Sequence, residues 1–200
     1  SIGSVHTVMK RKVILASASP RRLEIMNKHG VEPLVMPTDA DETITGDPSM
    51  TEVVEDLSRR KALACNNSIK EDNRYAGYMI VAADTIVYKD GILGKPVDAE
   101  DARRMLRSYR GTYHYVVTGI TLIDTDSGSE EVLSDVTRVW CKDYTDEDIE
   151  DYISRAEPYD KAGAYAIQGY FGRYIDHIEG DYENVVGLPY YRIEKILENC

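Results

Sequence analysis

The chain has 200 residues, of which 42% are hydrophobic, so it is long enough to bury one substantial core by itself. Its formal net charge of -11 makes the average surface repel phosphate backbones, which argues against a nucleic-acid partner and requires a local basic cluster for any anionic ligand. Three widely spaced cysteines fit neither a disulfide framework nor a zinc site, and no apolar run could span a bilayer, so we expect a cytoplasmic protein without membrane contact.

Short strands and helices alternate along the chain without a Pro/Gly/Ser-rich linker or an internal repeat, which indicates a single α/β domain over residues 11–200. Residues 1–10 are expected to be an N-terminal extension whose first four residues are typical of a cloning remnant. The first predicted strand covers residues 13–15. A helix is predicted to follow from Ser19 and Pro20, as N-cap and first helical residue, to about residue 28.

A long helix is predicted over residues 47–68, because apolar residues recur on one face at helical spacing, and Lys61 lies inside that apolar stripe. The apolar run 79–83 predicts a strand buried on both faces, which would present Asp84 and Thr85 at its carboxyl end. The following Asp-Gly pair at 90–91 predicts a tight hairpin.

The second half of the chain combines long strands with further helices. Three helices and two antiparallel strands joined by a turn at 126–128 are predicted: helices 98–109, 145–153 and 189–197, and strands 113–124 and 131–142. Residues 161–172 contain three glycines, which predicts a loop placed against a ligand.

The turn after the first strand gathers groups that bind anions. Ser17, the free amides of a helix N-terminus, Arg21 and Arg22 lie together there, and such a cradle suits a triphosphate. An ordinary capped helix with two solvated arginines is an equally weighted alternative.

Lys61 and Asp84 are charged residues at positions where charge is costly. Lys61 must either extend its ammonium group to water or contact a phosphate at the border of a cleft. Asp84, at the end of a buried strand, could bind a divalent metal, orient an attacking water molecule, or only cap the next turn. We favour a function for Asp84.

Three weaker signals complete the candidate site. Glu42 belongs to an acidic loop that either binds Mg²⁺ or is merely solvated. Lys95, in a Gly-Lys-Pro tripeptide that is not a P-loop, is a candidate phosphate cation. Gln168 offers a donor and an acceptor that could read the edge of a base, unless its glycine-rich loop is purely structural. The histidines show no metal spacing, and no serine-nucleophile triad is evident.

Six motifs occur in a specific order: ASASPRR at 16–22, Lys61 in a helix, AADT at 82–85, GKP at 94–96, DKAGAYAIQG at 160–169 and NVVGLP at 184–189. Together they resemble the Maf family over residues 13–197. The resemblance implies an elongated, twisted mixed sheet flanked by helices, with two lobes and a central cleft, related to inosine triphosphate pyrophosphatases. It also implies hydrolysis of a nucleoside triphosphate between its α and β phosphates with Mg²⁺ or Mn²⁺ as cofactor.

The resemblance assigns roles position by position. Asp84 matches the catalytic group that activates water, and Glu42 matches a carboxylate linked, with Asp84, to the metal. The phosphate-contacting positions are Ser17, Arg22, Lys61 and Lys95. The positions that tune base choice, in the subfamily resembling dTTP/UTP pyrophosphatases, are Arg21, Thr85 and Gln168. Ala166 departs from the glycine common before the Ile-Gln pair, which bears on base preference.

Two other functions compete with this reading. A 7-methyl-GTP pyrophosphatase would keep the chemistry and change the role of Gln168. A regulator of cell division would bind a nucleotide without turnover, although such a protein would gain little from a buried carboxylate at Asp84. A homodimer is an expectation from the family alone.

Overall fold

The computed structural model describes residues 9–199, which form a mixed α/β structure around one seven-stranded sheet. The strand order is β3-β2-β4-β6-β7-β8, and the short β5 pairs with β4. The strands are β2 (Lys12–Leu15), β3 (Leu34–Val35), β4 (Tyr78–Tyr88), β5 (Ile92–Leu93), β6 (Tyr113–Asp124), β7 (Glu130–Cys141) and β8 (Ile175–Glu179). Only the pairs of β2 with β3 and with β4 are parallel. The predicted mixed sheet is thus confirmed.

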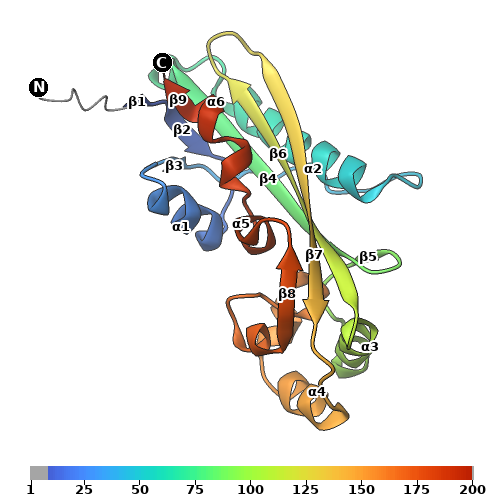
Figure 1. The fold of residues 1–200 in the computed structure, drawn as a ribbon. Coiled ribbons are helices and arrows are strands. Elements are labelled where there is room, and N and C mark those ends of the chain that lie inside the picture. The colour runs from blue at the N-terminus through green and yellow to red at the C-terminus, as the bar shows by residue number, and fades with distance from the viewer. Residues whose placement is uncertain (1–8, 200) are drawn as a thin grey trace, which may run out of the picture.

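The helices cover both faces of this sheet (Figure 1). They are α1 (Pro20–Lys28), α2 (Met50–Ile69), α3 (Ala99–Tyr109), α4 (Asp146–Ile153), α5 (Tyr182–Val186) and α6 (Glu194–Leu197). Because successive side chains of a strand point to opposite faces, Ile80 and Ala82 pack toward α2, whereas Val81 and Ala83 pack toward α1 and the segment around α5. Both faces of β4 are therefore buried, as the apolar run predicted.

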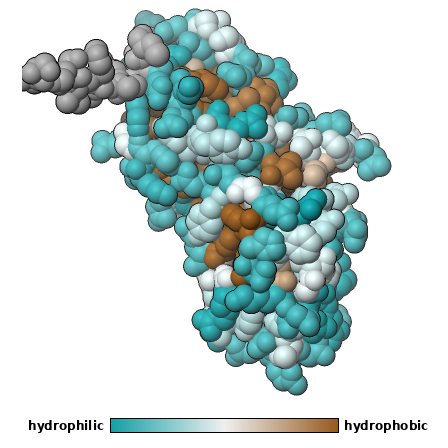
Figure 2. Space-filling model, viewed as in Figure 1, coloured by the Kyte–Doolittle hydropathy of each residue, from teal (hydrophilic) through white to brown (hydrophobic). Residues whose placement is uncertain are grey.

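The molecule is elongated because β4, β6 and β7 run through its whole length (Figure 1). One end is built on β2, β3, α1 and α2, while α3 and α4 form the other end beneath β8. A separate aromatic core fills that second end. The surface seen in Figure 2 is mostly hydrophilic, with hydrophobic residues gathered in small separate patches. Among residues 9–199, no helix is long and apolar enough to cross a membrane.

Local chemistry explains several element boundaries. Ser19 caps α1 by accepting a hydrogen bond from the Arg22 amide, and Pro20 follows in the first turn, as predicted. The start of α2 differs from the prediction: Ser49 is the N-cap and accepts from the Glu52 amide, so the helix begins at Met50 rather than at residue 47. The predicted capping box at Thr145 and Asp148 is present at the start of α4.

Two predictions about strand and helix ends were wrong. The strand with the apolar run continues to Tyr88, so Asp84 lies in the middle of β4 instead of at its end. The predicted C-terminal helix over 189–197 is broken into a 3₁₀ turn, Tyr190–Arg192, and the single-turn α6. Helix α6 ends where the chain extends into β9 (Glu198–Asn199), which pairs with β1 (Met9–Lys10).

Other features were not predicted or are only partly described. Strand β8 and the short helix α5 have no counterpart in the sequence prediction. The predicted loop at 161–172 is a series of 3₁₀ turns without regular strand structure, which agrees with the prediction. Of the expected extension, residues 1–8 lie outside the described residues, and the boundary at residue 11 stays a prediction.

Candidate active site

A cavity of about 190 Å³ lies where the two ends of the molecule meet. The first end contributes Arg21 and Arg22 from α1, and the second contributes the loop from Lys161 to Gln168. Thr85 from β4 also lines the cavity, between these two walls. Arg21, Thr85 and Gln168, to which the family resemblance assigns base choice, therefore line one cavity. Arg22, a candidate for phosphate binding, lies beside them.

Arg22 is held by neutral oxygen atoms. Its Nε donates to the Gly187 carbonyl at 2.8 Å, its Nη1 to Ser17 Oγ at 3.2 Å and its Nη2 to Thr85 Oγ1 at 3.1 Å. Burial lowers the pKa of Arg22 below its ordinary value, and the nearby Asp84 carboxylate opposes that shift. The guanidinium group is therefore fixed in place while its positive charge has no hydrogen-bonded carboxylate among residues 9–199.

A chain of buried polar groups supports this arrangement. Thr85 Oγ1 lies 2.8 Å from Thr118 Oγ1, and Thr118 in turn donates to the Asn184 carbonyl at 3.2 Å. The Asn184 side chain is fully buried and donates to Val116 O and Thr137 Oγ1. Asn184 therefore ties α5 to the sheet and places the Gly187 carbonyl that Arg22 binds, a role that the sequence did not reveal.

A second cluster lies on the α2 side of β4. Lys61 Nζ from α2 is 2.8 Å from Asp84 Oδ1 and 3.4 Å from Glu42 Oε1. Asp84 is 9% exposed, so its carboxylate is largely desolvated and the ammonium group compensates its charge. The charged lysine in an apolar helix stripe is thus explained by a fixed negative charge rather than by extension into water.

The two clusters adjoin one open stretch of strand edge. Strand β2 pairs with β4 only as far as Leu15 and Val81, and β5 pairs with β4 again only from Val87. Within the described chain, no strand therefore pairs with residues 82–86 on that edge. Asp84 and Thr85 lie in this gap and, as adjacent strand residues, point to opposite faces.

The remaining predicted positions fall outside the cavity lining. Ser17 reaches the site through its hydrogen bond with Arg22. Lys95 is exposed in the segment after β5, and its charge acts on the exposed Asp160 carboxylate. Lys161, which the sequence analysis did not single out, lines the cavity and pairs with Asp160 at 2.9 Å. Its place inside the DKAGAYAIQG motif was the only signal in the sequence.

The carboxylates of Asp84 and Glu42 fit a hard divalent cation. Both contact the same ammonium nitrogen, so their oxygen atoms converge on one place. Mg²⁺ is commonly bound by one or two carboxylates together with phosphate oxygens of the substrate. No group of three or more His, Cys, Asp or Glu side chains arranged for a metal exists among residues 9–199, so substrate oxygens would have to complete such a site.

Comparison with known proteins identifies the family. A family model described as Maf-like protein matches residues 12–200. The chain belongs to the Maf family. Relatives named dTTP/UTP pyrophosphatase include that of Caldicellulosiruptor bescii, 41% identical over 94% of both chains, and that of Alkaliphilus oremlandii, 43% identical over 94% of this chain and 96% of the relative.

Solved structures show weaker similarity to this Maf protein. The nucleoside-triphosphatase, dITP/XTP pyrophosphatase, of Mycobacterium abscessus aligns with a TM-score of 0.41 and 19% identity, covering 66% of this chain and 75% of the other. The Ham1 protein of Staphylococcus aureus aligns with a TM-score of 0.48 and 14% identity, covering 82% and 91%. The family assignment rests on the sequence matches.

Proposed function

We propose that this protein hydrolyses dTTP or UTP between the α and β phosphates, releasing the nucleoside monophosphate and pyrophosphate. The observation that carries the proposal is the open edge of β4, where a guanidinium group held by neutral oxygen atoms lies on one side and a desolvated carboxylate on the other. The names of the relatives, which are 40% identical or more in several cases, support the same activity.

The cationic side of the edge would bind the triphosphate. Arg22 is already oriented by three neutral acceptors, so little side-chain entropy remains to be lost when a phosphate binds. Ser17 and the amides at the start of α1 lie beside it and add donors for anionic oxygens. We also propose Lys95, and Lys61 from the α2 side of β4, as phosphate ligands.

The carboxylate side would supply the chemistry. In the proposed step a water oxygen forms a bond to phosphorus, the bridging phosphorus–oxygen bond breaks, and Asp84 accepts the proton of the water. Pyrophosphate leaves with the bond electrons. Lys61, 2.8 Å from Asp84 Oδ1, holds the carboxylate in position. A Mg²⁺ or Mn²⁺ ion bound by Asp84 and Glu42 would offset the negative charge of the phosphates.

Base choice would be made inside the cavity. Gln168 and Thr85 present hydrogen-bonding groups there, and Arg21 adds a third. Pyrimidines and purines differ in size and in the pattern of donors and acceptors on their edges, so a small cavity with a few fixed polar groups can separate them. The chain's Gln168 loop and the names of the relatives favour dTTP and UTP.

Pyrophosphate release from a panel of nucleotides tests the proposal. The panel contains dTTP, UTP, CTP, ATP, GTP and 7-methyl-GTP, each with Mg²⁺, with Mn²⁺ and with a chelator. We expect metal-dependent release that is fastest with dTTP or UTP. Fastest release from 7-methyl-GTP would change the substrate, and binding without release throughout the panel would point to the nucleotide-binding regulator.

Two further properties belong to the same proposal. We propose a cytoplasmic location, which is supported by the two described cysteines, Cys65 and Cys141, being buried free thiols. We also propose a homodimer, as the family resemblance implies. Sedimentation equilibrium on the full chain tests that state, and a single species at 22.6 kDa would contradict it.

A further inference from the structure

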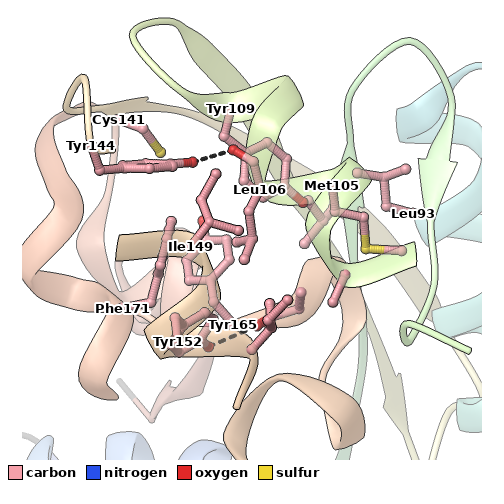
Figure 3. Close-up of a cluster of buried hydrophobic side chains, with 14 of the residues drawn as sticks. Leu93, Met105, Leu106, Tyr109, Cys141, Tyr144, Ile149, Tyr152, Tyr165 and Phe171 are labelled. Atoms are coloured by element: carbon pink, nitrogen blue, oxygen red, sulfur yellow. Dashed lines mark hydrogen bonds between the residues drawn. The ribbon is translucent and has the colours of Figure 1, made fainter. Parts of the chain in front are cut away.

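Two tyrosines from the aromatic core bind consecutive carbonyl groups of the loop that carries Gln168. Tyr109 of α3 donates its hydroxyl to Gly163 O at 2.9 Å, and Tyr152 of α4 donates to Ala164 O at 2.7 Å. Both tyrosines are at most 1% exposed. Figure 3 shows them entering the core from different helices, together with Tyr165 of the loop. The loop is therefore attached to both helices of the second end of the molecule.

The two bound carbonyls belong to residues with unusual backbone conformations. Gly163 has φ of +72° and Ala164 has φ of +74°. A side chain at Gly163 would lie 2.8 Å from carbon atoms of Val87, so only glycine fits there. Ala164, which has a side chain, adopts a left-handed conformation that is sterically unfavourable and persists only where surrounding contacts fix it. The tyrosine hydroxyls supply such contacts.

The fixed segment leads directly into the cavity. Tyr165, Ile167 and Gln168 follow it and line the cavity wall. The Tyr165 hydroxyl is hydrogen-bonded to Nε2 of the buried His114, so the first residue after the fixed segment is also anchored. On the other side, the Gly163 amide donates to Gly94 O at 3.0 Å, which ties the segment before Lys95 to the same loop.

We propose that Tyr109 and Tyr152 are positioning residues for base recognition, acting by holding the Gly163–Ala164 backbone so that Gln168 faces the bound base. This inference rests on the proposed nucleotide pyrophosphatase function. Neither tyrosine lines the cavity, so their effect on substrates is transmitted through the loop. No motif in the sequence distinguishes them from ordinary core residues.

Tyr144 provides a matched control within the same core. It is buried, and its hydroxyl also donates to a backbone carbonyl, that of Leu106 in α3 (Figure 3). Leu106 lies in a helix that does not line the cavity. The variants Y109F, Y152F and Y144F therefore each remove one buried hydroxyl-to-carbonyl hydrogen bond, but only the first two free the loop.

The experiment measures kcat and KM of the full chain and the three variants with dTTP, UTP and CTP. We divide kcat/KM for the preferred nucleotide by kcat/KM for each of the others. This selectivity ratio should fall by about fivefold in Y109F and in Y152F, because a neutral hydrogen bond contributes about that factor. The ratio should stay within about twofold in Y144F, because only general stability is affected. Equal ratios in all four proteins would overturn the proposal.

Hydrogen exchange at the loop amides separates this inference from the proposed function. The Gly163 and Ala164 amides are hydrogen-bonded to Gly94 O and Lys161 O, so both should exchange slowly in the unmodified chain. We expect faster exchange at these two amides in Y109F and Y152F and no change in Y144F. If the chain hydrolyses no nucleotide, the proposed function fails, whereas unchanged exchange in Y109F and Y152F overturns the positioning role by itself.

Discussion

The two sides of β4 handle charge in opposite ways. On the α2 side, the Asp84 carboxylate and the Glu42 carboxylate both contact the Lys61 ammonium group, which offsets part of their negative charge. On the cavity side, one residue further along the strand, Thr85 accepts a hydrogen bond from Arg22, whose other acceptors among residues 9–199 are also neutral oxygens.

This difference indicates which partner each side lacks. An arginine whose donors are used by neutral acceptors remains a net positive charge, and a low dielectric environment strengthens its attraction for an anion. The Asp84 carboxylate, by contrast, is held in one orientation by the Lys61 ammonium group. The comparison therefore predicts that substitution of Asp84 impairs turnover, whereas substitution of Arg22 impairs binding and substitution of Gln168 impairs base choice.

The largest effect is expected on the α2 side. D84N keeps the shape of the side chain and removes the group that would accept the proton of water, so kcat should fall by about a thousandfold, within the range for a lost general base. Nucleotide affinity, measured by calorimetry, should change by only a few-fold. D90N is the control, because Asp90 is exposed in the hairpin turn after β4 and should keep full activity. Turnover of D84N near that of the unmodified chain would contradict the role of Asp84 as the proton acceptor.

Arg22 tests the cavity side. R22K keeps the positive charge, but a lysine ammonium group lacks the planar guanidinium geometry that donates to Gly187, Ser17 and Thr85 at once. KM should therefore rise by about tenfold or more, with a smaller change in kcat. R59K is the control, since Arg59 of α2 forms an exposed ion pair with Glu130 of β7. A fall in kcat without a rise in KM would place Arg22 with the chemistry rather than with binding.

The contrast between the two sides of β4 shows where sequence reasoning succeeds. The apolar run predicted the buried strand, and the position of Lys61 in an apolar stripe predicted that it must meet a fixed negative charge or reach water. The strand was predicted to end at Asp84 because the apolar run stops at Ala83. A carboxylate inside a buried strand is costly, and the ammonium group that offsets the cost belongs to Lys61, 23 positions earlier in the chain. Local pattern cannot reveal that pairing.

The cavity side of β4 was harder to predict, because its contacts also join residues that lie far apart in the sequence. The family resemblance assigned Arg21, Thr85 and Gln168 to base choice, and all three line one cavity, while their role stays a prediction. Asn184 opens one of the six motifs and Tyr152 belongs to none, but no sequence pattern shows that both side chains bind backbone carbonyls of other segments. The C-terminal helix was overpredicted because Pro189 is a favoured first residue of a helix, whereas the chain forms the 3₁₀ turn Tyr190–Arg192 before α6 begins at Glu194.

The cavity side should also make stability depend on pH. His114 points to that side of the sheet, and burial lowers its pKa to about 3 from an ordinary value of 6.5. Between these values the unfolded chain binds more protons than the folded chain, so acid destabilises the fold. The contribution is complete above pH 6.5 and is lost as pH falls toward 3, with a slope of at most about 1.4 kcal/mol per pH unit.

Urea unfolding at several pH values measures this slope. H114Q keeps a hydrogen-bond acceptor for Tyr165 and cannot titrate, so its free energy of unfolding should fall less steeply with acid than that of the unmodified chain. H177Q is the control, because His177 is exposed on β8. If H114Q and the unmodified chain lose stability in parallel between pH 6.5 and 3, His114 is not held neutral by burial.

The smallest expected effect concerns Gln168. Its substitution separates base choice from phosphate binding among the residues on the cavity side of β4. Q168A removes one donor and one acceptor from the wall facing the base but leaves Arg22 and Asp84 in place, so the ratio of kcat/KM between dTTP and CTP should change by about fivefold. N67A, on the exposed face of α2, is the control. If Q168A instead lowers the rates of all nucleotides equally, Gln168 contributes to phosphate binding or to loop stability, and base choice must then lie with Arg21 and Thr85.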